Sequence, residues 1–589
     1  MAKEALVSLI VLVLVQVALA QGLVGASEYY VDINAGSNSN SGRSESDAWR
    51  TISFALDSVQ QEASASNPVT ICIAQGTYSP AAGELFGLVM RDYVSLKGAG
   101  GDFKTILDAQ GIDRVIYCII ARQVTISDVV IMNGKTEGDG AGIFALCSSP
   151  IVERCTFIRN RIVKAGGSGA GLSGISEDCR PVILDCNFIA NRSEAYGGAI
   201  ASGKVTVVDC LFDSNEAGED GGAVEVCFGE GLIEGCTFMG NTASMGGAVH
   251  CYGGESMVVR RCVMTGNAAY DGGGILFNNV ENALIEDCRI LHNTAQHNGG
   301  GILLNESSPV IKNCLIAQNQ TARFGGGVQL SSAAPEIRCT TVADNRAGVE
   351  GDGLCCAFGG RAIIVDSILW GNRDNELMLA TASFSDIQDQ LMDGPGNISA
   401  DPLYVLGEGC DYLLSQAAAG QASESPCIDA GSDSASTLGM AFYSTRTDNV
   451  SDTGIVDMGY HVPVAMPRVH AWPDAESYVL GGCLRPIVAA SNDGLPVFVD
   501  VCAGFVGPAG EVICLTNHGA TLGLAPWVSD LVLEHGFSFG PTVLMKLEIP
   551  YNLPAGEYMF FIALFSPGTT DPIGYPASFR FAVASQLDH

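Results

Sequence analysis

The middle of the chain repeats a short pattern in which an asparagine follows a cysteine by five residues. The last four steps from one cysteine to the next are 26 residues each, and two further repeats keep the asparagine while Thr340 and Ser367 take the cysteine position. The cysteines of this column are Cys155, Cys186, Cys210, Cys236, Cys262, Cys288 and Cys314, and the asparagines are Asn160, Asn191, Asn215, Asn241, Asn267, Asn293, Asn319, Asn345 and Asn372. A fixed period of this length is the signature of a repeat architecture, and it constrains the fold more than any other feature of the sequence.

The length and composition of the repeat predict one coil of a parallel β-helix. Each repeat contains short β-branched runs bounded by glycine pairs, Ser-Ser-Pro or asparagine, and none has helical periodicity. Helical repeats need about 33 residues or more and propeller blades about 40, while leucine-rich repeats need a leucine frame that this sequence lacks. Three short parallel strands joined by three turns fit the period, with coils stacked about 4.8 Å apart. We therefore predict an all-β solenoid with three strands per coil, regular over residues 135–375.

The columns of the repeat indicate which side chains point inward. Aromatic or aliphatic residues stand two positions after the cysteine, and Val or Ile stands three positions before it, so these columns fill the interior. The cysteine fits a narrow inward corner, where parallel Cβ vectors about 4.8 Å apart exceed the roughly 3.5–4.5 Å that a disulfide prefers. We expect buried thiols, with disulfides between coils as the alternative. Zinc binding by the cysteines is not expected, because no C-x-x-C pair occurs. The asparagines are expected to form a turn ladder whose amides bond along the stack.

The repeat resembles two groups of known proteins. The following segments are similar to the GGAI and FxxN repeats of chlamydial polymorphic outer-membrane proteins: Gly197-Gly-Ala-Ile200, Phe157-Ile-Arg-Asn160, Phe188-Ile-Ala-Asn191, Phe212-Asp-Ser-Asn215 and Phe238-Met-Gly-Asn241. They resemble still more the bacterial secreted right-handed parallel β-helix repeat proteins. This resemblance covers about residues 135–375 and implies that the coil is right-handed.

A second resemblance lies after the repeats. It is carried by Ser385-Asp-Ile-Gln388, Gly396-Asn-Ile-Ser-Ala-Asp-Pro402, Ser425-Pro-Cys-Ile-Asp-Ala-Gly431 and Asp457-Met-Gly-Tyr460, which are similar to the terminal segment of bacterial secreted β-helix proteins of the choice-of-anchor type. The activity of that family is largely unassigned. The resemblance therefore implies a secreted β-helix and brings little chemistry.

The first residues have the pattern of a signal peptide. Lys3 precedes an apolar run from Ala5 to Ala20 that closes with Ala18-Leu19-Ala20, the small-x-small pattern that a signal peptidase accepts. The run is shorter than the roughly 20 residues that a membrane span needs. We predict a signal peptide over residues 1–20, cleaved before Gln21, with an uncleaved N-terminal anchor as the alternative. No later stretch qualifies as transmembrane, so we expect a secreted, periplasmic or cell-surface protein.

The segments on either side of the repeats predict caps and a second domain. Residues 21–134 contain a strand, a loop, a helix at about 50–62 and irregular coils, and the helix would close the N-terminal mouth with Ile52, Leu56 and Val59. Residues 376–465 contain the last coils and a C-terminal cap. Residues 466–589 alternate strand-like runs with turns, a spacing typical of an antiparallel β-sandwich.

The charge of the chain excludes one class of partner. Acidic residues outnumber basic ones by 64 to 30, which gives a net charge of −34. A surface this acidic repels phosphate backbones and anionic lipids, so we exclude nucleic-acid binding as a main role. Neutral or basic ligands and divalent cations are compatible with it. We expect a monomer whose partner is a polysaccharide or a cell-surface protein.

One pair of outward-facing side chains could carry acid/base chemistry. The residues before Glu225 and His250 occupy one inward column, so Glu225 and His250 themselves point outward on successive coils. A carboxylate beside an imidazole can act in general acid/base catalysis, which makes these two the candidate catalytic residues. The alternatives are a solvent-exposed ion pair and a metal site that adds Asp220 and Asp271. The sequence assigns no metal ligand.

Enzymes with right-handed β-helices include polysaccharide lyases, polygalacturonases and pectin esterases, but a fold alone does not give a function. The Asn-Thr-Asp, Asp-Asp and Gly-His-Gly motifs of polygalacturonases are absent from this sequence, and the acidic calcium cluster of pectate lyases cannot be placed in it. No cofactor is indicated by a motif. Ca²⁺ is the ion that could assist a polysaccharide lyase or hydrolase acting on an outer face.

A second candidate surface is the turn before each glycine pair, which varies while its neighbours repeat. Stacked coils would align these turns into an exposed stripe that mixes aromatic rings with acids and amides. Aromatic faces bind sugar rings, and acids and amides bond to hydroxyl groups. The alternative is loop diversity without a ligand. With Tyr252 from the neighbouring strand, the candidate ligand-binding residues are Tyr196, Asp220, Tyr252, Tyr270, Asp271, Asn298 and Phe324.

These features leave three functions open. The leading hypothesis is an exported β-helix that binds a glycan or a surface protein through the stripe of variable turns and has no catalytic activity. The second is a polysaccharide lyase or glycoside hydrolase that acts on an outer face. The third is a structural spacer that presents the C-terminal sandwich.

Overall fold

The computed structural model describes residues 27–462, apart from 101–103, 357–358, 376, 378, 390 and 406–411, together with the strands and a few connecting residues of 463–584. The predicted signal peptide over residues 1–20 lies outside the described residues. Between Val462 and Pro463 the chain divides into two compact units, a solenoid unit and a C-terminal unit.

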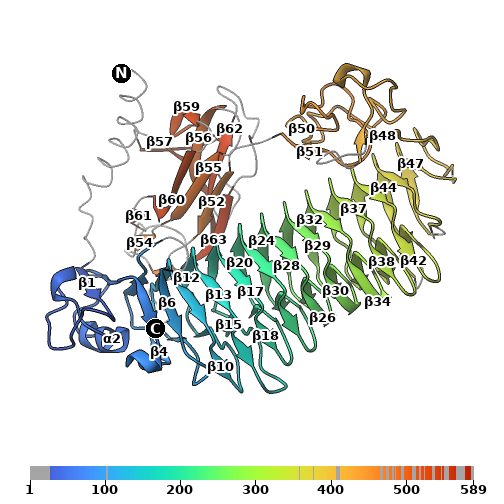
Figure 1. Ribbon diagram of the computed structural model, residues 1–589. Helices are drawn as coiled ribbons and strands as arrows, with labels where there is room; N and C mark the ends of the chain where they lie inside the picture. The colour runs from blue at the N-terminus through green and yellow to red at the C-terminus, as the bar shows by residue number, and fades with distance from the viewer. Residues whose placement is uncertain are drawn as a thin grey trace. The chain divides into compact units, whose positions relative to one another are not determined.

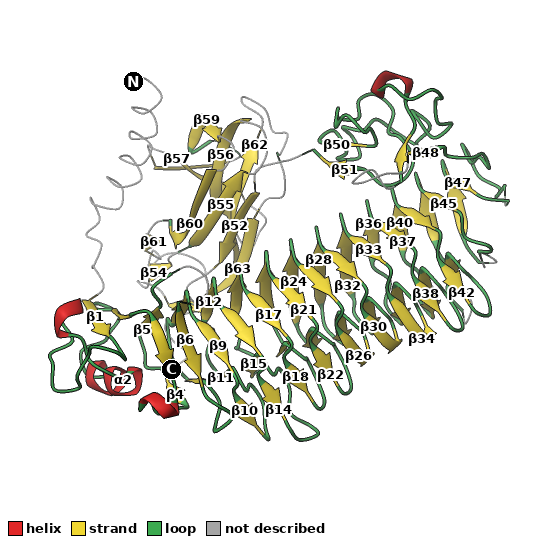
Figure 2. Cartoon of the chain, viewed as in Figure 1, coloured by secondary structure: helices red, strands yellow, loops and turns green. Residues whose placement is uncertain are grey.

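Residues 27–387 wind into a solenoid of parallel strands (Figure 1, Figure 2). One regular coil contains β20 (Val205–Val208), β21 (Leu211–Asp213), β22 (Glu216–Ala217) and β23 (Val224–Cys227). Each strand pairs in parallel with its equivalents one coil away, so four sheets run along the solenoid. We number them first to fourth in the order of these four strands, and they contain 14, 13, 9 and 11 strands. Their end strands are β1 (Ser27–Val31) and β46 (Thr381–Ser383), β3 (Gly76–Tyr78) and β47 (Asp386–Ile387), β10 (Lys135–Thr136) and β42 (Arg346–Ala347), and β4 (Leu88–Val89) and β43 (Leu354–Cys355).

The predicted parallel β-helix is confirmed with one correction, because each regular coil has four strands and not three. The additional strand belongs to the third sheet and is short, with two residues in β22. It lies between the asparagine corner and the glycine pair, in a segment whose variable side chains are typical of a loop. Its backbone is nevertheless extended and bonds to the neighbouring coil. The amide of Glu216, for example, donates to the carbonyl of Asn191 on the preceding coil at 2.9 Å. The variable side chains therefore sit on a regular backbone ladder.

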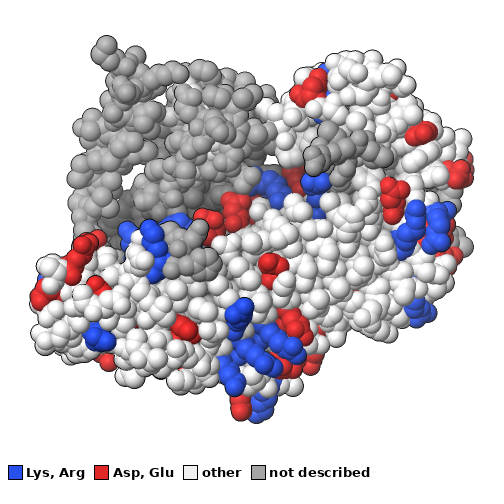
Figure 3. All heavy atoms as spheres, in the orientation of Figure 1, with Lys and Arg blue, Asp and Glu red and all other residues white. Residues whose placement is uncertain are grey.

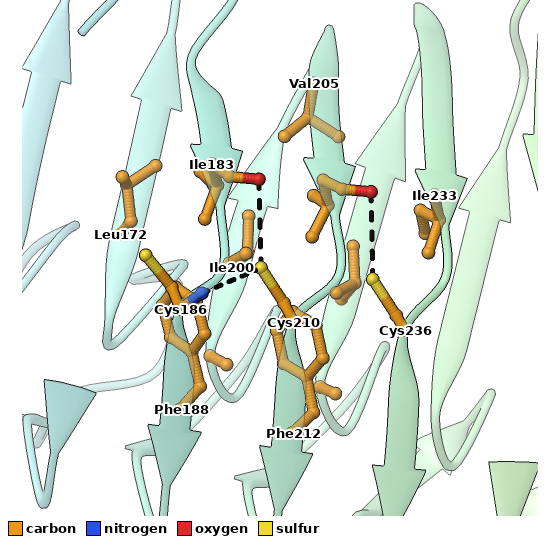
Figure 4. Packing of buried hydrophobic residues seen from close by; sticks show 14 of the residues in the cluster. Leu172, Ile183, Cys186, Phe188, Ile200, Val205, Cys210, Phe212, Ile233 and Cys236 are labelled. Atoms are coloured by element: carbon orange, nitrogen blue, oxygen red, sulfur yellow. Dashed lines mark hydrogen bonds between the residues drawn. The ribbon is translucent and has the colours of Figure 1, made fainter. Parts of the chain in front are cut away.

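Like residues stack over like residues in the interior. Phe157, Phe188, Phe212 and Phe238 are fully buried and form a column of nearly parallel rings, with successive centroids 4.4, 5.0 and 4.7 Å apart. Figure 4 shows two of these rings in line between neighbouring strands, together with the aliphatic side chains that pack beside them. Burial of one such ring stabilises the fold by about 1.5–3 kcal/mol. The inward columns of the sequence pattern are thus the core of the solenoid.

The cysteine column is buried, as expected. Its members are free thiols and are at most 3% exposed. The Sγ of Cys210 donates to the carbonyl of Ile183, and that of Cys236 donates to the carbonyl of Val207, both at 3.7 Å (Figure 4). Equivalent bonds recur at the other members of the column. The thiols therefore act as small buried side chains with a weak donor, and the alternative of disulfides between coils is wrong.

The asparagine column is a continuous hydrogen-bond ladder at one corner of the coils. The Oδ1 of Asn241 accepts from the backbone amide and from the Nδ2 of Asn215, at 2.9 and 3.0 Å. Its own Nδ2 donates to the carbonyl of Phe212 and to the Oδ1 of Asn267, at 3.0 and 2.9 Å. The side-chain bonds continue from Asn160 to Asn372. Because every amide in the ladder is buried and satisfied, it fixes the stacking of the coils as well as stabilising them.

A helix closes the N-terminal end of the solenoid, as predicted. It is α2 (Ile52–Val59), and it buries Ile52, Leu56 and Val59. The side chain of Thr51 caps its N-terminus by accepting from the amide of Phe54. The carboxylate of Glu84 also accepts from the free amide of Ile52 at 2.7 Å, which places a negative charge at the positive end of the helix.

After the last coil the chain folds back over the outer face of the second sheet. This segment contains β48 (Tyr404–Val405), β49 (Leu413–Leu414), β50 (Tyr443–Ser444) and β51 (Val462–Pro463). Tyr412 and Tyr460 pack on Leu315 and Ala317 of the second sheet. The Tyr443 hydroxyl also donates to the buried carboxylate of Asp287 at 2.7 Å. The segment thus covers a sheet face as well as ending the solenoid.

The C-terminal unit is built of antiparallel sheets. One has the strand order β52 (Arg468–Trp472), β55 (Ile487–Asn492) and β60 (Phe537–Val543). The larger one has the order β53 (Ser477–Val479), β63 (Ala577–Ala584), β62 (Gly556–Phe565), β56 (Val497–Val506), β57 (Val512–Thr516) and β58 (Gly519–Leu522), with β59 (Val528–Leu533) beside β56. All of these pairs are antiparallel except β53 with β63. A two-stranded sheet of β54 (Cys483–Leu484) and β61 (Leu547–Glu548) completes the described strands.

Across the described residues of both units, no helix has the length and the apolar composition that a membrane span requires.

Removal of one rung of the asparagine ladder should destabilise the solenoid. In Asn267→Ala, Asn241 loses the oxygen that accepts from its backbone amide and its Nδ2, and the carbonyl of Phe238 loses its donor. Because these groups are buried, we expect the free energy of unfolding to fall by about 2–4 kcal/mol. Denaturant unfolding followed by circular dichroism measures the effect. The exposed neighbour Thr242→Ala is the control and should change stability by less than about 0.5 kcal/mol. Equal stabilities of the two variants would contradict the ladder's role.

Thiol labelling of the native protein should modify Cys147 and spare the cysteine column. Cys147 is exposed, whereas the column is buried, and burial raises the pKa of Cys236 and Cys288 so that little thiolate forms there. We expect a maleimide to label Cys147 in buffer and the column only after denaturation, as read by mass spectrometry of peptides. Disulfide-linked peptides from neighbouring coils would refute the reduced column.

Candidate functional site

The outer face of the fourth sheet is the floor of the candidate site. Its strands here are β19 (Ile200–Ser202), β23, β27 (Val249–Tyr252), β31 (Ile275–Asn278), β35 (Ile302–Asn305) and β39 (Val328–Ser331). The first and third residues of β23, Val224 and Val226, belong to the core, so the second and fourth point outward. Pairing between coils aligns the second residues into one row, Ala201, Glu225, His250, Leu276, Leu303 and Gln329. The fourth residues form a parallel row, Cys227, Tyr252, Asn278, Asn305 and Ser331.

The variable turn of each coil folds over this floor and forms a wall. It can do so because the glycine that follows has a left-handed backbone: Gly221 has φ +65°, and a Cβ there would lie 2.9 Å from the Cβ of Glu225. Backbone pairing joins Asp220 to Met245, Met245 to Asp271 and Asp271 to Asn298. The same ladder continues through Asn298, Phe324 and Glu350. The turns of successive coils are therefore in register and line one side of the floor.

Between wall and floor lies a groove of about 430 Å³. Residues from several successive coils line it: Met245, Asp271, Leu276, Asn278, His297, Asn298, Leu303, Asn305, Arg323, Phe324, Gln329 and Ser331. Among the candidates from the sequence, Asp271, Asn298 and Phe324 belong to this lining. Tyr196, Tyr252 and Tyr270 are not among the lining residues, although Tyr252 and Tyr270 are exposed nearby.

A bulge in the wall brings a histidine into the groove. Strand β34 (Thr294–Asn298) has one residue more than its partner β30 (Ala268–Asp271) between their paired ends, and the extra length accommodates His297. The His297 ring stacks on Tyr270 with centroids 5.0 Å apart, and its Nδ1 lies 3.1 Å from Asp271 Oδ1. Its Nε2 contacts the guanidinium of Arg323. The imidazole is thus held between a carboxylate and a guanidinium at the edge of the groove.

The groove has the chemistry of a hydroxyl-binding surface. Asn278 and Asn305 lie side by side on the floor, and the Nδ2 of Asn305 donates to the Oδ1 of Asn278 at 3.1 Å. On the wall, Arg323 lies over the ring of Phe324, with its Cζ 5.0 Å from the ring centroid. Amides, a guanidinium and an aromatic ring can together bond to the hydroxyls and pack on the apolar face of a sugar ring.

The sequence pattern could have found the lining residues that it missed. Arg323 stands two residues before its glycine pair, as Tyr270 does before its own. Asn305 and Ser331 occupy the position of Asn278, and Gln329 occupies the position of Glu225. The floor residues expected from the sequence, Glu225, His250 and Tyr252, lie on two coils, and the equivalent residues of the later coils were not among them. The signal was the repeat itself, applied to every coil.

Glu225, His250 and Asp220 form a separate cluster next to the groove. His250 Nδ1 lies 3.6 Å from Asp220 Oδ2 and 3.8 Å from Glu225 Oε1. The Cys227 thiol donates to Glu225 Oε1 at 3.0 Å. His250 is 1% exposed and Glu225 is 4% exposed, so the alternative of a solvent-exposed ion pair is wrong. The two side chains point out of the core as predicted, but the wall covers them.

Burial changes the acidity of groups around this cluster. It raises the pKa of Asp220 to about 6, an effect that His250 opposes and Glu225 reinforces. At the neighbouring turn, a hydrogen bond to Glu219 raises the pKa of Tyr196 to about 12. Asp271, which the sequence joined to this cluster, instead pairs with His297 in the groove.

Basic side chains elsewhere on the solenoid often lie beside acidic ones. Figure 3 shows Lys and Arg gathered with Asp and Glu over β14 (Arg161–Ile162), β18 (Arg192–Ser193) and β22. There Arg192 contacts Glu216 at 3.0 Å and Glu194 at 3.4 Å. The local basic charge is therefore balanced, and this face does not form a basic patch of the kind that binds nucleic acid.

The glycine that lets the wall cover the floor should tolerate substitution poorly. Gly272 has φ +67° and its Cβ would lie 2.8 Å from the Cβ of Leu276, whereas Gly266 has φ +65° and open space around it. We expect Gly266→Ala to lower the free energy of unfolding by about 1–2 kcal/mol through backbone strain alone. Gly272→Ala should cost about 1–3 kcal/mol more because the wall must move. Denaturant unfolding compares the two, and equal losses would contradict the close approach of wall and floor.

Two family descriptions match the chain. Residues 221–390, which include all of the residues that line the groove, match the family described as right handed beta helix region. Residues 34–111 match a protein of unknown function, DUF1565. Curated proteins give no match.

Several solved structures are similar at low identity. The A-module of mannuronan C-5 epimerase AlgE6 of Azotobacter vinelandii is 14% identical with a TM-score of 0.32, over 59% of this chain and 95% of that chain. The AlgE4 A-module of the same organism is 17% identical with a TM-score of 0.28, over 58% and 89%. The tailspike protein of Acinetobacter phage vB_ApiP_P1 is 8% identical with a TM-score of 0.28, over 90% and 84%. The four stacked parallel sheets and the match over residues 221–390 show that the solenoid has the right-handed parallel β-helix fold.

Proposed function

We propose that this chain is an exported protein, extracellular or on the cell surface, that binds a linear glycan in the groove along the fourth sheet and does not cleave it. The observation that carries the proposal is the groove itself, because its lining residues come from successive coils in register. A linear polymer presents similar groups at regular intervals. A surface built by repetition along one axis is suited to such a ligand.

The lining supports a neutral glycan. Asn278, Asn305 and Ser331 offer amide and hydroxyl groups in one row, and Phe324 offers a ring on the opposite side. Arg323 and Asp271 bring one positive and one negative charge, so the lining as described has no excess of either. The net charge of −34 disfavours a strongly anionic polymer.

Two features favour binding over cleavage. Glycoside hydrolysis commonly uses two carboxyl groups on either side of the scissile bond. The described lining residues provide one carboxyl group, that of Asp271, because Glu225 is covered by the wall. The covered pair Glu225 and His250 would not reach a substrate in the groove without movement of the wall.

A second function is favoured by one observation. The His297 imidazole sits in the groove, oriented by Asp271 at 3.1 Å and in contact with Arg323. A base beside a guanidinium is an arrangement that could remove a proton next to a sugar carboxylate, as a polysaccharide lyase requires.

Some parts of the proposal rest on the sequence alone. They are export, attachment at a surface, a monomeric state and a cell-surface protein as the alternative partner.

The proposal is tested by the binding of plant and microbial cell-wall glycans to the full chain. We expect one class of linear glycan to bind, and Phe324→Ala and Asn305→Ala each to weaken binding about tenfold, equivalent to about 1.4 kcal/mol. The matched control is Phe228→Ala, which removes an exposed aromatic ring outside the groove and should leave binding unchanged.

The same samples are assayed for new reducing ends and for absorbance of unsaturated products. Products that disappear in His297→Ala would favour the lyase over the binding protein. Binding that persists in both groove variants would refute the groove as the site and would favour a spacer whose C-terminal unit carries the binding. No binding to any glycan would count against the proposal as a whole.

A further inference from the structure

The cluster beside the groove has a feature that a charge pair does not explain. His250 is 1% exposed, yet neither Nδ1 nor Nε2 of its ring has a hydrogen-bond partner among the described residues. The Oδ1 of Asp220 is also buried without a partner there. A buried polar atom without a partner costs about 1–3 kcal/mol, so such atoms are rare unless something else satisfies them.

The two carboxylates lack the usual source of compensation. Within the described part of the solenoid unit, the ion-pair contacts of Asp220 and Glu225 are with His250 alone, and neither is paired with a lysine or an arginine. The imidazole has at most one positive charge for two carboxylates. A bound divalent cation would balance the charge and would satisfy the unpartnered atoms at the same time.

The three side chains converge with the spacing of metal ligands. One ligand atom from each of Asp220, Glu225 and His250 lies within 4.8 Å of the other two. Two ligands of a tetrahedral zinc ion, each about 2.0–2.1 Å from the metal, are about 3.4 Å apart. The distances from His250 Nδ1 to the two carboxylates are 3.6 and 3.8 Å, so small side-chain adjustments would complete the site.

We infer that Asp220, Glu225 and His250 bind a divalent transition-metal ion, and zinc fits this donor set best. An imidazole nitrogen is a common ligand of zinc, whereas Ca²⁺ and Mg²⁺ prefer oxygen ligands in larger number. Three protein ligands leave a fourth position for water or for a ligand group. The site joins two coils through Glu225 and His250, and it joins the wall to the floor through Asp220.

The neighbouring residues support the same assignment. Cys227 donates to Glu225 Oε1 at 3.0 Å and so orients the carboxylate from outside the ligand set. One coil after Asp220, Met245 stands in its wall position, and one coil after His250, Leu276 stands in its row. The three ligating side chains are thus confined to two coils of an otherwise repeated surface.

The test is zinc binding by the metal-stripped full chain in competition with a chromophoric chelator. We expect one tight site per chain and a rise in the thermal unfolding temperature on zinc addition. The variant His250→Leu places in this row the same residue that Leu276 provides one coil further on, so it should keep the fold and the circular dichroism spectrum. It should bind zinc at least a hundredfold more weakly and show no thermal shift. Cys227→Ala should weaken binding about tenfold.

Cobalt substitution adds a readout that does not depend on stability. Co²⁺ in a four-coordinate site should give strong visible absorption in the wild type and none in His250→Leu. The control His297→Gln removes a histidine that also lies beside an aspartate and should leave zinc affinity unchanged. Zinc binding that survives in His250→Leu, or tight binding of Ca²⁺ without binding of zinc, would overturn the assignment. Glycan binding is measured separately, so loss of the metal site and loss of the proposed function can be told apart.

Discussion

The stacking register of the coils is the constraint on which the rest of the structure depends. Backbone bonds between coils hold it, and the buried asparagine ladder pins it at one corner. The steps between ladder residues vary, with 31 residues from Asn160 to Asn191 and 24 from there to Asn215, yet the amides still meet. Insertions and deletions are therefore absorbed in the turns. Because a slip of one residue would exchange inward and outward faces, a fixed corner determines which side chains reach the surface on every coil.

Much of the solenoid follows from the sequence, because its period, its inward columns and its helical cap each have a local signature. The phenylalanine column, the thiols and Ile52, Leu56 and Val59 of α2 are where the pattern predicts them. The fourth strand was missed for a physical reason. Two-residue strands such as β22 have no side-chain pattern of their own and exist only through bonding to the coils on either side.

The candidate site was harder to predict, because it depends on the backbone conformation of the turns as well as on the position of each residue in the repeat. Outward position was correctly assigned to Glu225 and His250, but outward does not mean exposed when a turn folds back over the strand. That fold-back requires the left-handed conformation of residues such as Gly221. The same wall that covers the acid and imidazole groups forms one side of the groove a coil or two further on. The role of His297 likewise depends on a bulge, which adds one residue to the wall without disturbing the ladder.

The uniform asparagine corner has a consequence for how such a protein can change size. Since each coil contacts mainly the coil before and the coil after it, a stretch of one full period could be duplicated or lost with the same corner geometry restored at the junction. The span of the groove is then a whole number of coils. Ligand length becomes a property that a lineage can adjust in discrete increments, by copying a segment and not by redesigning a surface.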